Sequence, residues 1–297
     1  MTYKHLLSIL FALATLIWIF TACEKDDDPD TSDDDTDDTE QLTNQQVLET
    51  IADYSKAQAM FNEATDEAEH AARVSDDSID SGKGFYAKSG EYPQITIDPF
   101  DGTTWPKTIT VDFGDQNMTC EDGVERRGVI NIEATDFYRN TGSELTTTFS
   151  EYYQNDYKVE GTRVCTNNGE NEAGNLTYSL VVTDGHIITP EADHIYYEES
   201  TDREWIAGDT TVLDPWDDNY LVTGTQSGLS SDSIPYQLTV HAADPLDVLV
   251  GCKWVRAGKL DLDIETVPTI TIDYGDGTCD DQAVATMYGE NYPFTMQ

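Results

Sequence analysis

Apolar and polar positions follow two different patterns along this chain. Between residues 41 and 75, apolar or small residues recur every three or four positions, which is the period of an amphipathic α-helix with one buried face. Thr43 and Gln46 predict a capping box at its start, and we expect the helical segment to fill 41–80. The residues on the apolar stripe are Val47, Ile51, Tyr54, Ala57, Phe61, Ala64, Ala68 and Ala71.

From residue 85 to residue 297, short segments rich in Val, Ile, Thr, Tyr and Phe alternate between apolar and polar residues. Gly, Asn, Asp and Pro separate them, which favours antiparallel strands with one face exposed to solvent. We therefore predict a mainly β fold, an antiparallel meander or a sandwich-like sheet, on which the preceding amphipathic helix packs. The predicted strands are 94–98, 107–113, 128–134, 145–153, 158–164, 176–183, 194–198, 220–224, 234–241, 259–264 and 269–274.

The N-terminal segment has the order of a bacterial lipoprotein signal. Lys4 precedes an apolar stretch at 6–20, which is shorter than the roughly 20 residues of a membrane span. The small residues Thr21 and Ala22 then precede Cys23. We predict that 1–22 is a signal peptide and that Cys23 carries acyl chains such as palmitate, which together hold a protein stably on a bilayer. An uncleaved membrane anchor is the alternative.

An acidic segment follows Cys23 directly. Residues 24–40 contain 11 acidic residues and one basic residue, so we expect 23–40 to be a lipidated Cys with an extended, solvated tether. The sequence at 23–28 (CEKDDD) resembles the surface-export signal of Bacteroidetes lipoproteins. That resemblance implies a protein of the outer membrane that faces the cell exterior. The alternative is an acidic linker without a sorting role.

The whole chain is strongly acidic. Its 297 residues include 58 Asp or Glu against 16 Lys or Arg, a formal net charge of −42. Such a charge opposes binding to nucleic acid and to an anionic membrane surface, so the predicted contact with the membrane is through the lipid anchor. The acidity favours binding of divalent cations and, equally, solubility in a saline habitat.

Four cysteines remain after Cys23. An even number in an exported chain favours two disulfide bonds, for which three pairings are possible. We favour Cys120–Cys165 and Cys252–Cys279, because each pair lies within one half of the chain. The four residues are widely spaced and form no CxxC motif, so they do not predict a zinc site.

One strand-and-turn unit is duplicated in the sequence. The segment 108–115 (TITVDFGD) recurs as 269–276 (TITIDYGD), and each copy continues through Thr-Cys and two acidic residues to a Gly at the same distance. The duplicated units are therefore 108–128 and 269–289. In the structural interpretation, the Asp before each Gly ends a strand, and the Gly permits a positive φ in the turn.

The second copy also offers a candidate calcium site, because calcium binds several carboxylate oxygens. The spacing of its acidic residues differs from that of an EF-hand loop, so turn capping is the alternative to ligation. In the first copy, Gln116 and Asn117 make a similar site weaker. The candidate ligands are Asp273, Asp276, Asp280 and Asp281.

Several segments carry a family resemblance. They are 128–133, 159–163, 251–254 (GCKW) and, above all, 272–280 (IDYGDGTCD). These segments resemble a family of uncharacterised exported lipoproteins of Bacteroidetes, especially of the flavobacterial type. The resemblance extends over most of the chain. It implies an exported, β-rich protein and names no catalytic residue.

No motif in the chain names a reaction. HExxH and the Gly-x-Ser-x-Gly elbow are absent, and with 58 acidic residues the sequence cannot single out a catalytic carboxylate pair. His186 and His194 lie in loop-like stretches near Asp184 and Asp193, where solvated histidines are commoner than a metal pair.

Aromatic residues are frequent in the β region. On a sheet face they can stack on sugars, although they more often pack in the core. The candidate stacking residues are Trp105, Trp205, Trp216, Trp254, Tyr152, Tyr153, Tyr196 and Tyr197.

Together these features predict a surface-displayed lipoprotein with a non-enzymatic binding or envelope-structural role. One alternative is a polysaccharide-binding accessory protein or a glycan hydrolase. Another is a calcium-stabilised adhesion module. Besides the membrane, the expected partner is an extracellular glycan or protein.

Overall fold

The computed structural model describes residues 42–82, 93–120, 122–211, 214–252 and 254–296. The predicted signal peptide, Cys23 and the tether lie outside these residues. The elements are α1 (Asn44–Ser81), β1 (Gln94–Asp98), β2 (Lys107–Asp112), β3 (Met118–Thr119), β4 (Glu125–Ala134), β5 (Glu144–Gln154), β6 (Tyr157–Glu170), β7 (Leu176–Ile188), β8 (His194–Ala207), η2 (Pro215–Asp217), β9 (Asn219–Leu229), β10 (Pro235–Val240), β11 (Leu246–Leu249), β12 (Ala257–Ile264), β13 (Ile270–Asp276), β14 (Gln282–Met287) and β15 (Glu290–Thr295).

The described strands form one antiparallel sheet that follows the chain almost without crossovers. Their order is β1-β2-β4-β5-β6-β7-β8-β9-β10-β12-β13-β14-β15, with β3 paired to β4, and β11 paired to β9 and β12. The predicted mainly β fold with one preceding helix is confirmed, and its form is the meander. Such a layer leaves two faces to be covered or solvated.

Each of the predicted strands is present, and the central ones are longer than predicted. β6, β7 and β8 extend to 13 or 14 residues, because bulges keep their pairing going past the point where the alternation of the sequence breaks. The sequence did not predict β3, β11, β14 and β15, which are short or carry a weak alternation.

The ends of α1 are fixed by the local sequence. The Thr43 hydroxyl accepts a hydrogen bond from the backbone N–H of Gln46, and the Gln46 side chain accepts one from the backbone N–H of Thr43. The predicted capping box is therefore confirmed. At the other end, Gly82 takes the left-handed conformation with φ 65° and donates to the carbonyl of Ile79.

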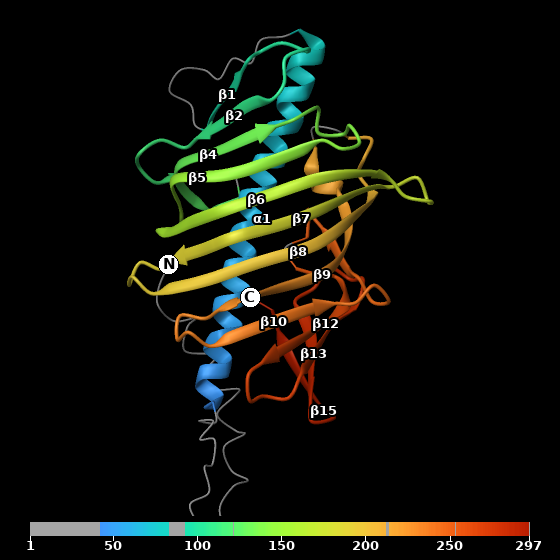
Figure 1. Cartoon of the computed structure of the whole chain (residues 1–297). Helices are drawn as coiled ribbons and strands as arrows, with labels where there is room; N and C mark the ends of the chain where they lie inside the picture. Colours follow the sequence, from blue (N-terminus) through green and yellow to red (C-terminus); the bar gives the residue numbers. More distant parts are fainter. Residues whose placement is uncertain (1–41, 83–92, 121, 212–213, 253, 297) are drawn as a thin grey trace, which may run out of the picture. The chain divides into compact units, whose positions relative to one another are not determined.

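The helix runs across the strands on one face of the sheet, as Figure 1 shows. With 38 residues it is about 57 Å long, enough to pass from β10 to β2 at about 4.8 Å per strand. We call the face under α1 the inner face and the opposite one the outer face. The inner face is thereby closed to solvent over much of the sheet.

Apolar contacts on the inner face follow the predicted stripe. Phe61 stacks on Tyr197 of β8 with ring centroids 5.2 Å apart, and Tyr54 packs against Tyr236 of β10 at 5.7 Å. Between and beyond them, the helix presents alanines. Small side chains let the helix backbone approach the strands closely, so large residues of the sheet fill the interface. The buried alanines are Ala57, Ala64, Ala68, Ala71 and Ala72.

Charged side chains are buried on the same inner face. Glu69 of α1 is 3% exposed and accepts hydrogen bonds from Arg203 of β8 and, at 3.1 Å, from the hydroxyl of Tyr138. Arg163 of β6 lies 3.8 Å from the same carboxylate. Burial alone would raise the pKa of Glu69, but the guanidinium groups of Arg203, Arg163 and Arg73 outweigh it and hold that pKa below its usual range.

A second buried ion pair lies one turn further along the helix. Arg73 donates to Asp218 at 2.8 Å, and the Asp218 side chain is fully buried. The hydroxyl of Tyr220 donates to the same carboxylate at 3.3 Å. Gly208 makes room for this carboxylate, because a Cβ there would lie 2.4 Å from Asp218 Oδ1. The helix is thus fixed to the sheet by charge as well as by apolar contact.

Glu69→Gln should destabilise the protein strongly. The substitution leaves buried Arg203 and Arg163 without their carboxylate, and breaking a buried ion pair on one side costs about 3–5 kcal/mol. Urea unfolding followed by circular dichroism measures the free energy of unfolding. Glu49→Gln, on an exposed position of the same helix, is the control and should change that free energy by less than about 0.5 kcal/mol. A loss below 1 kcal/mol for Glu69→Gln would contradict the assignment.

Asp76→Asn should stabilise the protein more at pH 8 than at pH 5.5. Burial raises the pKa of Asp76 to about 7, although its carboxylate accepts a hydrogen bond of 2.8 Å from the backbone N–H of Tyr138. A carboxyl with a raised pKa in the folded state stabilises the protein fully below its unfolded pKa of about 4, and this contribution is lost as the pH rises through 7. Asn keeps an acceptor for Tyr138 without the charge.

The expected gain in the free energy of unfolding is on the order of 1–3 kcal/mol at pH 8 and clearly smaller at pH 5.5. Urea unfolding at the two pH values measures it. Asp77→Asn on the exposed neighbouring position should change neither value. An equal gain at both pH values would show that the carboxyl of Asp76 does not titrate between them.

Candidate functional site

The outer face of β8 carries the aromatic residue around which the candidate site is built. Side chains alternate along this strand, so Tyr197 points to the inner face and is buried, while Tyr196 points to the outer face and is 45% exposed. His186 of β7 is the direct cross-strand neighbour of Tyr196. Their rings are parallel within 5°, with centroids 4.8 Å apart, so one face of the Tyr196 ring is covered.

His186 is held from both of its ring nitrogens. Its Nδ1 lies 3.0 Å from a carboxylate oxygen of Glu160 on β6, and its Nε2 lies 2.8 Å from Nδ1 of His194. The hydrogen bonds from Lys158 and His186 lower the pKa of Glu160, so this carboxylate is ionised and only accepts. His186 therefore donates to Glu160 through Nδ1, while its Nε2 shares a hydrogen bond with Nδ1 of His194.

A groove lies on the side of Tyr196 away from His186. It has a volume of about 690 Å³ and crosses the outer face from β8 to β12. Two cross-strand rows form it: Tyr196 is paired with Leu229 and then Pro235, and Glu198 is paired with Ser227, Gln237 and Asp263. We call this feature the Tyr196 groove. Its full lining is Tyr196, Glu198, Ser227, Gly228, Leu229, Pro235, Tyr236, Gln237, Asp263, Ile264 and Glu265.

The Tyr196 groove is acidic. Three of its residues are Glu198, Asp263 and Glu265, and none of them forms an ion pair with a Lys or Arg within the described part of the chain. Glu198 accepts a hydrogen bond of 3.0 Å from the backbone N–H of Asp184, and Asp263 accepts one from the hydroxyl of Thr269. Each carboxylate keeps further acceptor capacity for a ligand.

The strand beneath the groove is fixed by a contact that requires glycine. The hydroxyl of Tyr236 on β10 donates to the backbone carbonyl of Tyr196 on β8 at 3.1 Å, so it passes the intervening strand β9 at Gly228. A Cβ at Gly228 would lie 1.9 Å from the carbonyl oxygen of Tyr196 and 2.6 Å from the Tyr236 hydroxyl. The position of Tyr196 is therefore set from below as well as from the side.

Three of the four predicted calcium ligands line one pocket, and Asp281 is not among its lining residues. Asp273, Asp276 and Asp280 line a pocket of about 370 Å³, together with Gly275, Thr278 and Gln282. Each of the three carboxylates accepts a hydrogen bond from the backbone N–H two residues later, at 3.0, 3.2 and 2.9 Å respectively. The carboxylate of Asp281 accepts from the side chain of Gln282.

These contacts give the aspartates a role as caps of their own turns. Asp273 also forms an ion pair of 3.0 Å with Lys259. Across the residues that the structure describes, no three or more His, Cys, Asp or Glu side chains are grouped so that they could hold a metal ion. Calcium binding by Asp273, Asp276, Asp280 and Asp281 stays a prediction from the sequence.

The duplicated unit is a shared strand and turn. Asp112 at the end of β2 accepts from the N–H of Gly114 at 2.8 Å, as Asp273 does from Gly275, and both glycines have positive φ values of 82° and 98°. Beyond the turn the copies differ. Gly128 lies at a bulge between β4 and β5, whereas Gly289 lies between β14 and β15.

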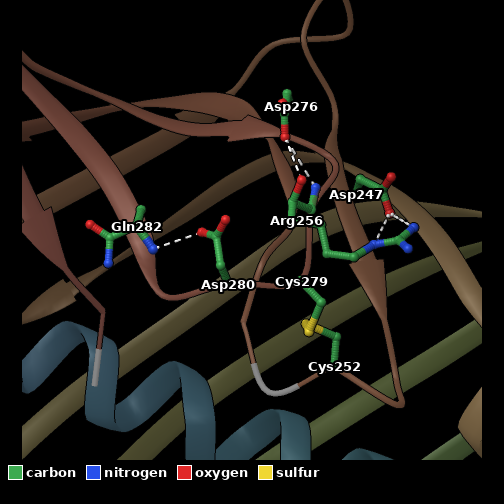
Figure 2. The surroundings of a disulfide bond; sticks show 8 residues. Asp247, Cys252, Arg256, Asp276, Cys279, Asp280 and Gln282 are labelled. Carbon is green, nitrogen blue, oxygen red and sulfur yellow. Dashed lines mark hydrogen bonds and ion pairs between the residues drawn. A yellow bond between two sulfur atoms is a disulfide. The ribbon is translucent and has the colours of Figure 1, made fainter.

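The predicted disulfide Cys252–Cys279 is confirmed. Figure 2 shows it joining the segment after β11 to the turn after β13, beside the hydrogen bonds that Arg256 gives to Asp247. The two Cα atoms are 6.0 Å apart. The bond closes a loop that contains β12 and β13, which stabilises this end of the sheet.

The predicted disulfide Cys120–Cys165 is wrong, because both residues are free cysteines. Cys120 follows β3, which pairs with β4, whereas Cys165 lies on β6, and β5 separates the two strands. Cys165 faces the helix side and is buried, and this burial raises the pKa of its thiol to about 12. Proximity in sequence could not reveal the intervening strand.

Three of the eight aromatic residues that the sequence singled out are buried in the core. Trp205, Tyr152 and Tyr197 are at most 2% exposed, whereas Tyr196 and Trp216 are well exposed. Of the predicted set, Tyr196 lines the groove. His186 and His194 lie on strands rather than in loops. The sequence missed Glu160, Ser227, Gln237 and Asp263 as site residues, because only the strand register brings them beside Tyr196.

Comparison with protein-family models, with curated proteins and with solved structures finds no match for this chain. None of the helices among the described residues has an apolar stretch long enough to cross a membrane. Cys23, the predicted site of lipidation, lies outside those residues.

Alkylation should distinguish the cysteines of the folded domain. In the unfolded, unreduced chain, iodoacetamide should label Cys120 and Cys165 but neither Cys252 nor Cys279, and prior reduction should expose all four. In the native protein, Cys165 should stay unlabelled because its thiol is buried with a raised pKa. Peptide mass spectrometry reads the result. Labelling of Cys252 without reduction would contradict the observed pairing.

Proposed function

We propose that this protein is a lipid-anchored binding protein of the outer membrane, displayed on the cell exterior, and that the Tyr196 groove is its binding surface. The observation that carries the proposal is an exposed tyrosine held from behind by His186, at the edge of a groove whose carboxylates have no cationic partner among the described residues. A side chain fixed before binding loses little conformational entropy when a ligand arrives.

The arrangement of the two faces supports binding on the outer one. The inner face packs on α1 through buried aromatic residues and through ion pairs such as Glu69–Arg203 and Arg73–Asp218. Because opening that interface would expose buried charges, the outer face is where a ligand can bind without unfolding.

The chemistry of the Tyr196 groove supports binding more than hydrolysis. His186 has both ring nitrogens engaged and lies behind Tyr196, so it is not placed to exchange protons with a ligand in the groove. Glu198 and Asp263 lie on the same cross-strand row with β9 and β10 between them, as part of an array of side-chain acceptors and donors. Such an array suits recognition of a polar ligand.

The sequence supports the location. Cys23 ends a signal-like segment, and the 17 residues from 24 to 40 can span at most about 60 Å when extended. A tether of that length would hold the domain away from a bilayer. Repulsion within the acidic tether favours such extended conformations.

Lipid labelling and protease accessibility test the proposed anchor and display. In a bacterial host with an outer-membrane lipoprotein pathway, an alkyne fatty acid should label the wild type, and Cys23→Ala should abolish the label. Cys120→Ala is the control and should keep it. Protease added to intact cells should digest the wild-type domain. Persistent labelling of Cys23→Ala, or full protection of the wild type in intact cells, would overturn the proposal.

A further inference from the structure

We propose that the Tyr196 groove binds an extended polysaccharide whose sugars carry free amino groups. The inference rests on the proposed binding role of the groove and names its ligand class. It follows from one juxtaposition on an exposed sheet face. The Tyr196 ring, stacked on His186, lies beside a row of carboxylate, amide and hydroxyl side chains, and these carboxylates have no ion-pair partner in the described part of the chain.

The ring of Tyr196 supplies a surface on which a sugar can stack, and we call this ring the stacking wall. His186 covers the ring face on the side of β7, while the residues that line the groove come from β8 to β12, on the other side of the ring. The second ring face is therefore turned toward the groove. Aromatic rings offer apolar area with a negative π face, on which the C–H side of a sugar ring and a nearby ammonium group are both favourable.

The second row supplies polar partners across four strands. Glu198, Ser227, Gln237 and Asp263 are successive cross-strand neighbours, and neighbouring strands are about 4.8 Å apart. A ligand that follows this row runs across the strands, meeting a carboxylate at each end with a hydroxyl and an amide between them. The repeated hydroxyl and amino groups of a linear polysaccharide match such a series of acceptors and donors.

The same geometry disfavours a peptide on this face. Strands bind peptides through the N–H and C=O groups of an open edge, but the central strands β8, β9, β10 and β12 are already paired on both sides. A peptide that lay across them would find side chains but no backbone partners for its own amide groups. A polysaccharide has no such requirement.

The negative charge of the groove favours sugars that carry a protonated amino group. Glu198, Asp263 and Glu265 have no ion-pair partner within the described residues, and the chain carries a net charge of −42. Uronic and sulfated sugars would be repelled. A protonated amine would form a charge-assisted hydrogen bond with these carboxylates, whereas the acetylated amine of the same sugar would not.

Glu160 and His186 act as positioning residues for the wall. Glu160 orients His186, and His186 backs the ring of Tyr196. His186→Ala should therefore weaken binding through a mobile Tyr196, even though every residue that lines the groove is retained. Tyr196→Phe keeps the stacking ring and should retain binding within about threefold.

The experiment compares a β-1,4-linked glucosamine hexasaccharide with its fully N-acetylated counterpart, using the full-length protein and calorimetry at 150 mM salt. Wild type should bind the free amine form at least tenfold more tightly than the acetylated form. Tyr196→Ala should lose at least tenfold, and Glu198→Gln combined with Asp263→Asn should lose at least fivefold. The urea concentration at the midpoint of unfolding is measured first for each variant, and it should equal that of the wild type.

A matched charge control separates the groove from the overall acidity. Glu133→Gln combined with Glu172→Gln removes two carboxylates at exposed positions outside the groove and should change the affinity less than twofold. Equal binding of both sugars, an unaffected Tyr196→Ala, or an equal loss in the control variant would each overturn the inference. If one of these outcomes is found while the protein is still lipid-labelled and exposed to protease, only the ligand class is overturned and the proposed location is retained. Conversely, absence of the lipid label would overturn the proposed anchor without changing the sugar-binding result.

Discussion

The structure depends on the contact between α1 and the inner face of the sheet. A single-layer sheet has two faces, and its hydrophobic face must be buried against something. Here one long helix crosses from β10 toward β2 and supplies that cover. Its alanines let it approach closely, while Phe61 and Tyr54 stack on tyrosines of the strands. The rest of the molecule follows from this asymmetry between a covered and an uncovered face.

Charge is distributed in a way that fits the same asymmetry. The chain has seven arginines, and three of them, Arg73, Arg163 and Arg203, are gathered with Glu69 and Asp218 where α1 meets the sheet. Buried ion pairs contribute little net stability, but they penalise any docking that leaves one partner alone. They therefore specify where along the sheet the helix lies. The carboxylates of the groove on the outer face, by contrast, have no ion-pair partner among the residues that the structure describes.

The side chains of the outer face are fixed in position because the strands beneath them pack against α1. Tyr196 is held by His186 on one side and, through its carbonyl, by Tyr236 beneath Gly228. Its buried neighbour Tyr197 is fixed by Phe61 of the helix. One strand thus connects the helix interface to the groove, with alternate side chains serving the two faces. A ligand would meet a surface whose shape is already set, which lowers the entropy cost of binding.

Several features could be predicted from the sequence because they depend on interactions between residues that are close in the chain. The 3.6-residue period and the Thr43–Gln46 capping box placed α1, alternation placed most strands, and the Asp-aromatic-Gly-Asp repeat marked two like turns. Tertiary structure alone decided the rest. Bulges prolonged β7 and β8, so that His186 and Tyr196 became neighbours. β5 separated Cys120 from Cys165. The pairing register of β8, β9, β10 and β12 assembled the groove. Periodicity records which face a residue occupies, whereas register records which residues meet, and register depends on contacts between segments distant in the chain.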